Sequence, residues 1–138
     1  MADIGAATRT KLVGTVAVAA IVGTRIYPDH LPQGATLPAA VYHVVSGTDE
    51  VDLAGMSGVA HSRIQIDAYA ETRTSANLLA LAIRDAMATT HSRGTWGTVA
   101  TLGTTPQGGE RYDTQSVGDG SDERQFITMR DYLISFAG

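Results

Sequence analysis

The segment from His61 to Ala70 alternates apolar and polar residues more regularly than any other part of the chain, and it therefore constrains the fold most. The side chains of Ile64, Ile66 and Ala68 point to one face of an extended strand, and the side chains between them point to the other. Such alternation is typical of an antiparallel sheet that packs one face on a core and keeps the other face polar. The sequence therefore predicts a sheet built around this strand.

Three further strands are expected. The valine- and tyrosine-rich segment Ala39–Val45 is predicted to pair with the strand at 61–70, and the polar, glycine-bearing segment Ser46–Gly58 is predicted to be the connection between them. The other two strands are predicted at Val99–Leu102 and Phe126–Phe136. The sheet is thus expected to consist of long β-hairpins.

The segment Gly103–Glu123 joins the last two predicted strands. It contains five glycines and no apolar periodicity, so it is predicted to be a long loop, of the kind that is usually functional or disordered. Part of it, Arg111–Val117, is predicted to extend the flanking strands into a second hairpin. Gly94–Gly97 is predicted to be a turn.

Two helices are predicted, at Ala6–Ala20 and Thr74–Thr90, because apolar residues recur there every three or four positions. Gly23 follows the first helix where a helix stop is expected. Prolines exclude a helix between His30 and Pro38. The predicted buried stripes are Leu12, Val13, Val16, Ala19 and Ala20 in the first helix, and Leu79, Ala82, Ile83, Ala86 and Met87 in the second. The candidate N-caps of the second helix are Thr72, Thr74 and Ser75.

These elements predict one α+β domain over residues 1–138, in which two helices pack on one face of an antiparallel sheet of four or more strands. The chain has no cysteine, which excludes disulfides and thiolate metal sites. It has no apolar run of about 18 residues, so no transmembrane helix is predicted. The first residues include Asp3 and lack a basic region, which argues against a secretory signal.

The charge pattern does not favour nucleic-acid binding. The formal net charge is −4, nine of the ten basic residues are scattered arginines, and only 6% of residues are aromatic. Binding to phosphates requires a basic patch, and stacking on bases requires aromatic side chains. A protein that lets DNA pass without binding it would show this pattern, and so would almost any cytosolic domain.

No catalytic constellation is found in the sequence. Ser57 lies in a Gly-Met-Ser-Gly run, but Val59 stands where a nucleophile elbow needs glycine. The acidic run Gly118–Glu123 resembles a fragment of a calcium loop, but the ligand positions are not filled. His43 and His61 are placed to meet across the first hairpin, which would give two metal ligands at most. We therefore predict no catalytic residue, no metal and no cofactor.

Two groups of charged residues have open alternatives. Arg25, beside Ile26 and Tyr27, is expected either to bind a carboxylate in a bidentate manner or to form an ordinary surface salt bridge. Asp49, Glu50 and Asp52 are predicted to form a charged hairpin tip rather than a pair of catalytic acids.

Three segments together resemble the phage tail-completion and tail-terminator family. They are the helix stop and proline-marked turns of Gly23–Pro38, the strand Arg63–Tyr69 leading into an alanine- and leucine-rich helix, and the closing strand with Arg130-Asp131-Tyr132. The resemblance implies a non-enzymatic virion protein at the head-proximal end of the tail. It implies a homohexameric ring that caps the tail tube, joins it to the head connector and lets DNA through its lumen.

The implied partners are other copies of the chain, the tail tube protein and the head–tail connector, with no membrane involved. Long hairpin edges are consistent with a ring, because neighbouring copies would cover them. Two other functions stay open: a head-side connector or adaptor of a phage or gene transfer particle, and a small enzyme or binding module. The interface candidates are Arg25, Asp49, Glu50, Asp52, Arg63, Asp67, Arg111, Asp122 and Arg130.

Overall fold

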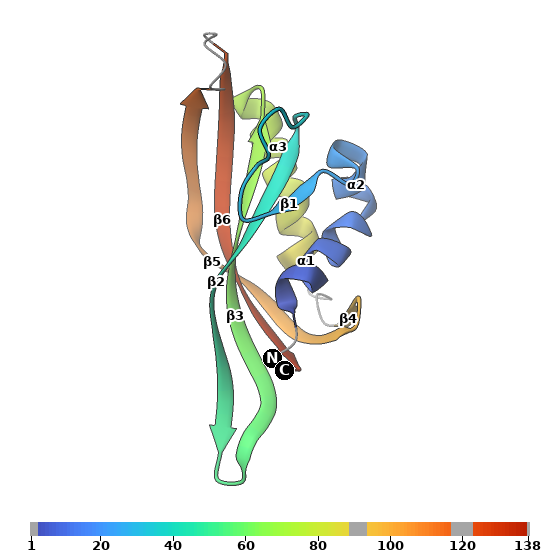
Figure 1. Ribbon diagram of the computed structural model, residues 1–138, viewed down its shortest axis with the longest axis vertical. Helices are drawn as coiled ribbons and strands as arrows, with labels where there is room; N and C mark the ends of the chain where they lie inside the picture. Colours follow the sequence, from blue (N-terminus) through green and yellow to red (C-terminus); the bar gives the residue numbers. More distant parts are fainter. Residues whose placement is uncertain (1–2, 89–93, 117–122, 138) are drawn as a thin grey trace.

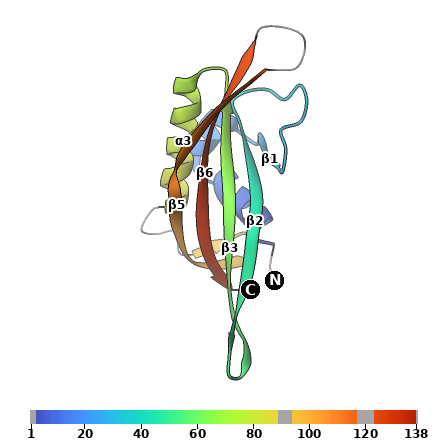
Figure 2. The same ribbon diagram turned by 90° about the vertical axis from the view of Figure 1, so that its left-hand side faces the viewer.

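A computed structural model describes residues 3–88, 94–116 and 123–137. In chain order the elements are α1 (Ile4–Val13), α2 (Val16–Val22), β1 (Ile26–Pro28), β2 (Ala39–Asp52), β3 (Gly55–Ala70), α3 (Arg73–Ala88), β4 (Gly94–Trp96), β5 (Val99–Ser116) and β6 (Arg124–Ala137). The strands form one sheet in the order β1-β2-β3-β6-β5-β4. The sheet curls into a half-barrel, and the helices lie against one of its faces (Figures 1 and 2).

The α+β class, the sheet of more than four strands and the long hairpins are confirmed, but two details of the predicted architecture are wrong. The sheet is mixed, because β1 pairs with β2 in parallel while all other pairs are antiparallel. Three helices are present in place of two, because the first predicted helix is broken.

The break in the first helix lies at Gly14 and Thr15. Gly14 closes α1, and Thr15 adopts an extended backbone at the start of α2, so that the two helices are bent by 86° relative to each other. The predicted stripe fails beyond the break, where Val16 is exposed and Val18 and Val22 are buried instead. Glycine and threonine have low helix propensity and are common at helix boundaries. The helix therefore ends here, and packing on the sheet stabilises two short helices in place of one continuous helix.

The other end of this region follows the sequence prediction. α2 ends at Val22, and Gly23 has φ +59, a left-handed conformation that glycine adopts without a steric penalty. Residues 29–37 then run without a helix to β2, as their prolines require. Taken singly, none of the described helices is long and apolar enough to cross a membrane, and α1 and α2 pass that test only as a bent pair.

The predicted connection at Ser46–Gly58 is wrong. β2 and β3 stay paired until Asp52 and Gly55, and only Leu53 and Ala54 form the turn. The hairpin therefore projects well beyond the body of the molecule (Figure 1). Its outer part lacks apolar alternation because neither face packs on the core, so backbone pairing alone specifies these strands.

The predicted loop at Gly103–Glu123 is also wrong over its described part. β5 continues to Ser116 and pairs with β6, with a bulge between Gln107 and Arg111. The predicted extension from Arg111 is confirmed as far as Ser116, and Val117 lies outside the described residues. The predicted turn at Gly94–Gly97 is largely the short strand β4. Pro106 is tolerated because that part of β5 is an edge strand.

The core lies between the helices and the inner face of the sheet. The alternating residues Ile64, Ile66 and Ala68 are buried there, as predicted. α3 covers them with its predicted stripe. Four of the five residues of this stripe are buried, and Ala82 is partly buried. Among the three candidate N-caps of α3, Thr72 is the one whose side chain accepts from a backbone N–H, that of Ser75 (3.1 Å).

Candidate interaction surface

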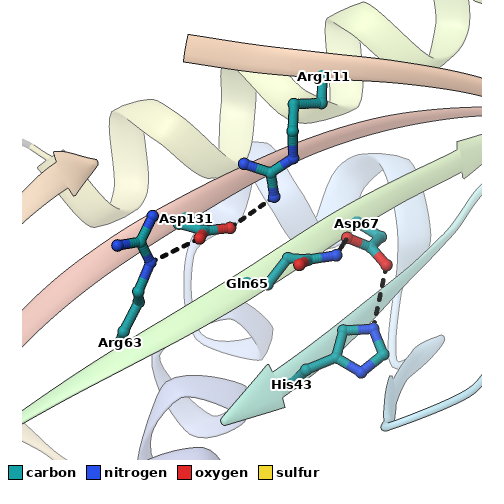
Figure 3. Close-up of polar contacts among 6 residues, drawn as sticks. All are labelled: His43, Arg63, Gln65, Asp67, Arg111 and Asp131. Atoms are coloured by element: carbon teal, nitrogen blue, oxygen red, sulfur yellow. Dashed lines mark hydrogen bonds and ion pairs between the residues drawn. The ribbon is translucent and has the colours of Figure 1, made fainter. Parts of the chain in front are cut away.

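The face of the sheet opposite the helices, here called the outer face, carries a buried carboxylate between two arginines (Figure 3). Nε of Arg63 on β3 donates to Oδ2 of Asp131 (2.6 Å), and Nη2 of Arg111 on β5 donates to Oδ1 (2.7 Å). Three strands thus meet at one carboxyl group, on a residue that is 6% exposed. Burial alone would raise the pKa of Asp131, but hydrogen bonds and charge from Arg111 and Arg63 outweigh it and lower the pKa.

A second buried carboxylate lies beside the first. Oδ1 of Asp67 accepts a hydrogen bond from Nε2 of Gln65 (2.8 Å), and its Oδ2 lies 3.0 Å from Nε2 of His43. Figure 3 shows that these side chains come from the neighbouring strands β2 and β3. Asp67 is therefore satisfied within its own subunit, and it braces the outer face rather than offering a free charge.

The β2–β3 hairpin carries the predicted acidic tip. Oδ1 of Asp52 accepts from the backbone N–H of Ala54 (2.8 Å) and closes the turn. Oε1 of Glu50 lies 2.6 Å from Nε2 of His61. His43 and His61 do not meet, because His43 pairs with Gln65 and His61 with Thr48 in the β2–β3 register. That predicted contact is wrong.

The same tip exposes large apolar side chains, which the sequence analysis did not single out. Val51 is 70% exposed, Met56 is 66% exposed and Leu53 is fully exposed. Clustered apolar side chains on a projecting hairpin are typical of surfaces that meet another molecule. The residue pattern of this segment is that of a loop, so no local signal indicated that these side chains stand together on a paired arm.

Arg73, at the start of α3, was also missed. Its guanidinium lies 5.2 Å from the ring centroid of Tyr112 and 5.4 Å from that of Phe126. It donates to the carbonyl oxygens of Ile127 and Asp113, both at 2.7 Å. This side chain fastens the far half of the β5–β6 hairpin to α3, and no local spacing relates it to partners so far along the chain.

Arg25, Arg130 and Asp122 are the three remaining interface candidates, and their interface role stays a prediction. Arg25 has neither of its predicted partners, because it donates to the carbonyl oxygens of Pro38 (3.0 Å) and Ile21 (3.2 Å). Arg130 lies 3.8 Å from Glu110, and its buried Nε has no hydrogen-bond partner among the described residues. Asp122 lies outside the described residues. Arg25 is thus a brace between α2 and the start of β2.

The described residues bring no group of three His, Cys, Asp or Glu side chains together that could hold a metal ion. Oγ of Ser57 accepts from the backbone N–H of Val59 (3.3 Å) near the hairpin turn. The calcium-like run lies outside the described residues over 118–122. The described residues do show interlocked ion pairs on the outer face and an exposed arm at the β2–β3 turn.

The fold matches that of a solved structure, and the sequence matches a family model. The structure superimposes with a TM-score of 0.66 on a chain of a structure entitled "Virion of native gene transfer agent (GTA) particle", at 19% identity over 95% of this chain and 92% of that chain. At this identity the match shows a shared fold. No curated protein matches the chain in sequence. The family model described as "Tail completion protein gp17" matches residues 6–101, and the chain therefore belongs to the tail completion protein gp17 family.

Proposed function

We propose that this protein is a structural component of the virion tail that closes the head-proximal end of the tail tube and joins it to the head connector. Membership of the tail completion family supports the tail location. We also propose that the chain works as one tail-terminator-like domain and has no catalytic role. Its buried acids, Asp67 and Asp131, serve to hold strands together.

The single observation that carries the proposal is the projecting β2–β3 hairpin. Val51, Leu53 and Met56 are exposed on it, beyond any contact with the core of their own subunit. A subunit that remained alone would gain nothing from such an arm, whereas a subunit of a larger assembly gains contact area from it.

Six copies in a ring are the assembly that we propose. The described part of β2 beyond Tyr42 and of β5 beyond Thr101 has no strand partner on its outer side. These two open edges lie at opposite ends of the strand order, so head-to-tail neighbours would cover both. Bulges interrupt each edge, which favours contacts through side chains over one continuous ladder.

Deletion of the gene tests the function. Without a terminator, tube growth has no stop, so the expected particles are DNA-filled heads separate from tails, some of abnormal length. A variant in which one Asn-Gly dipeptide replaces residues 50–59 lacks the end of the β2–β3 hairpin. Supplied to the deletion strain, it should fail to restore tailed particles. Ser57→Ala should restore them. Normal tailed particles from the deletion strain would refute the proposal, and twelve copies per particle would favour a head-side connector.

A further inference from the structure

The Arg63–Asp131–Arg111 cluster of the outer face holds two guanidiniums and one carboxylate, and the neighbouring carboxylate of Asp67 is bonded to Gln65 and His43 instead. Arg63 and Arg111 share the single carboxylate of Asp131, and each uses only one of its donor nitrogens there. Both arginine side chains remain well exposed, at 43% and 44%. Among the described residues neither guanidinium has a second acceptor, so the pair can still receive a carboxylate from outside.

Leu133 adds an apolar contact to this charge. It lies directly opposite Arg63 in the β3–β6 register and two residues from Asp131, so it shares their face. Thr105, opposite Leu133 on β5, is exposed as well. We call Arg63, Arg111 and Leu133 the arginine face: two positive groups with an exposed leucine beside them.

The hairpin tip, defined as Asp49–Met56, has the complementary composition. It combines three carboxylates with the exposed side chains of Val51, Leu53 and Met56, and it contains no basic residue. The tip cannot reach the arginine face of its own subunit. The β2–β3 ladder holds it extended, and the strand from Arg63 to Gly55 spans about 26 Å.

We propose that the tip of one copy docks on the arginine face of the next copy, with a tip carboxylate completing the Arg63–Asp131–Arg111 cluster and tip apolar side chains covering Leu133. The proposal rests on the ring proposed above and assigns its subunit contact. Because the two surfaces differ, the contact is heterologous and repeats head to tail. A docked carboxylate would balance two guanidiniums with two carboxylates.

The exposed leucines of α3 fit the tip less well. Leu78 and Leu81 are exposed on α3, but the nearby Arg84 is already 3.3 Å from Asp85. Arg73, the other cation of that helix, already donates to the carbonyl oxygens of Ile127 and Asp113, so neither arginine of α3 is available to a tip carboxylate. Charge complementarity therefore selects the arginine face over α3.

Cysteine cross-linking tests the geometry, since the natural chain has no cysteine. The variant Leu53→Cys/Leu133→Cys should form disulfides between copies in concentrated protein and in tailed particles, giving a ladder of linked chains. Leu53→Cys alone should give no more than pairs. Leu53→Cys/Leu78→Cys is the matched control and should not form the ladder. A ladder from this control variant, and none from Leu53→Cys/Leu133→Cys, would overturn the proposal.

Charge reversal tests the chemistry independently of disulfide geometry. Asp49→Lys/Asp52→Lys reverses the tip, and Arg111→Glu reverses the arginine face. Each variant alone places like charges at every contact and should lower assembly by about tenfold or more. An equal mixture of the two variants should recover assembly. If the variants alternate along the assembly, each tip meets an arginine-face position of opposite charge.

The outcomes separate the docking proposal from the proposed function. Circular dichroism must first show that each variant is folded. If Arg111→Glu is not folded, Arg111→Gln replaces it as a single variant that lowers assembly, and the mixture is not used, because a neutral face cannot pair with the reversed tip. Folded variants that assemble like the unmodified chain, or a mixture that stays unassembled, would overturn the docking contact alone. Normal tails without the protein would overturn the proposed function instead.

Discussion

Among single residues, Asp131 holds together three strands. Its carboxylate lies on β6 and binds arginines from β3 and β5, so the pairing of these strands depends on one charged group. Asp131→Asn is expected to lower the free energy of unfolding by about 1–3 kcal/mol at pH 7. The loss is smaller than the ~3–5 kcal/mol of a fully buried pair, because water still reaches both guanidiniums.

The effect of this substitution should depend on pH. Because the folded-state pKa of Asp131 is lowered from its ordinary 3.8, its stabilisation is present above that value and is lost as the pH falls through the lowered one. Urea unfolding should therefore show the two proteins converging in acid. Asp85→Asn, which removes an exposed pair with Arg84, serves as control and should change stability by no more than about 0.5 kcal/mol. A constant gap across the acid range would contradict this account.

Among the elements, the β5–β6 hairpin depends on a residue of α3. Replacing Arg73 with methionine removes its bonds to the carbonyl oxygens of Ile127 and Asp113 and its two aromatic contacts. Hydrogen exchange should accelerate in 111–116 and 124–128 and stay unchanged in the β2–β3 hairpin.

Two further variants sharpen this test of the hairpin. Arg73→Lys should rescue little, because an ammonium cannot donate in the planar fork that reaches both carbonyl oxygens. Arg84→Met, on the same helix, should leave exchange in 111–116 unchanged. Equal exchange rates in the Arg73→Met variant and the natural chain would show that β5–β6 pairing alone fixes the hairpin.

Elements with a local pattern were predictable from the sequence, and elements fixed by distant partners were not. The alternation of Ile64, Ile66 and Ala68 and the stop at Gly23 are local signals, and both were interpreted correctly. The outer halves of β2 and β5 bury little on either face, so only pairing with β3 and β6 makes them strands. The Arg63–Asp131 contact joins residues 68 positions apart, a relation that strand register alone creates.

For the whole molecule, the charge distribution predicts weak binding to duplex DNA. The net charge is −4, and Arg9, Arg25 and Arg73 donate to backbone carbonyl oxygens of their own subunit. Fluorescence anisotropy at moderate salt should therefore give a dissociation constant no tighter than the ~10⁻⁴ M of weak non-specific binding. Arg111→Gln should not change it. Tight binding with a steep salt dependence would contradict the proposal that DNA passes through a ring of these chains without being bound.

The layout of β3 and β6 has a mechanical consequence. These central strands pair over an unbroken register from Val59–Ala137 to Ala70–Phe126, and the two long hairpins extend toward opposite ends of the molecule (Figure 1). A pull on the outer end of β2 and β3 against the outer end of the described parts of β5 and β6 therefore runs along the strands, at right angles to the hydrogen bonds of the antiparallel ladder. The bonds are loaded in shear and share the tension, so they must fail together and not one after another. A subunit built this way resists stretching along the axis that joins its two arms.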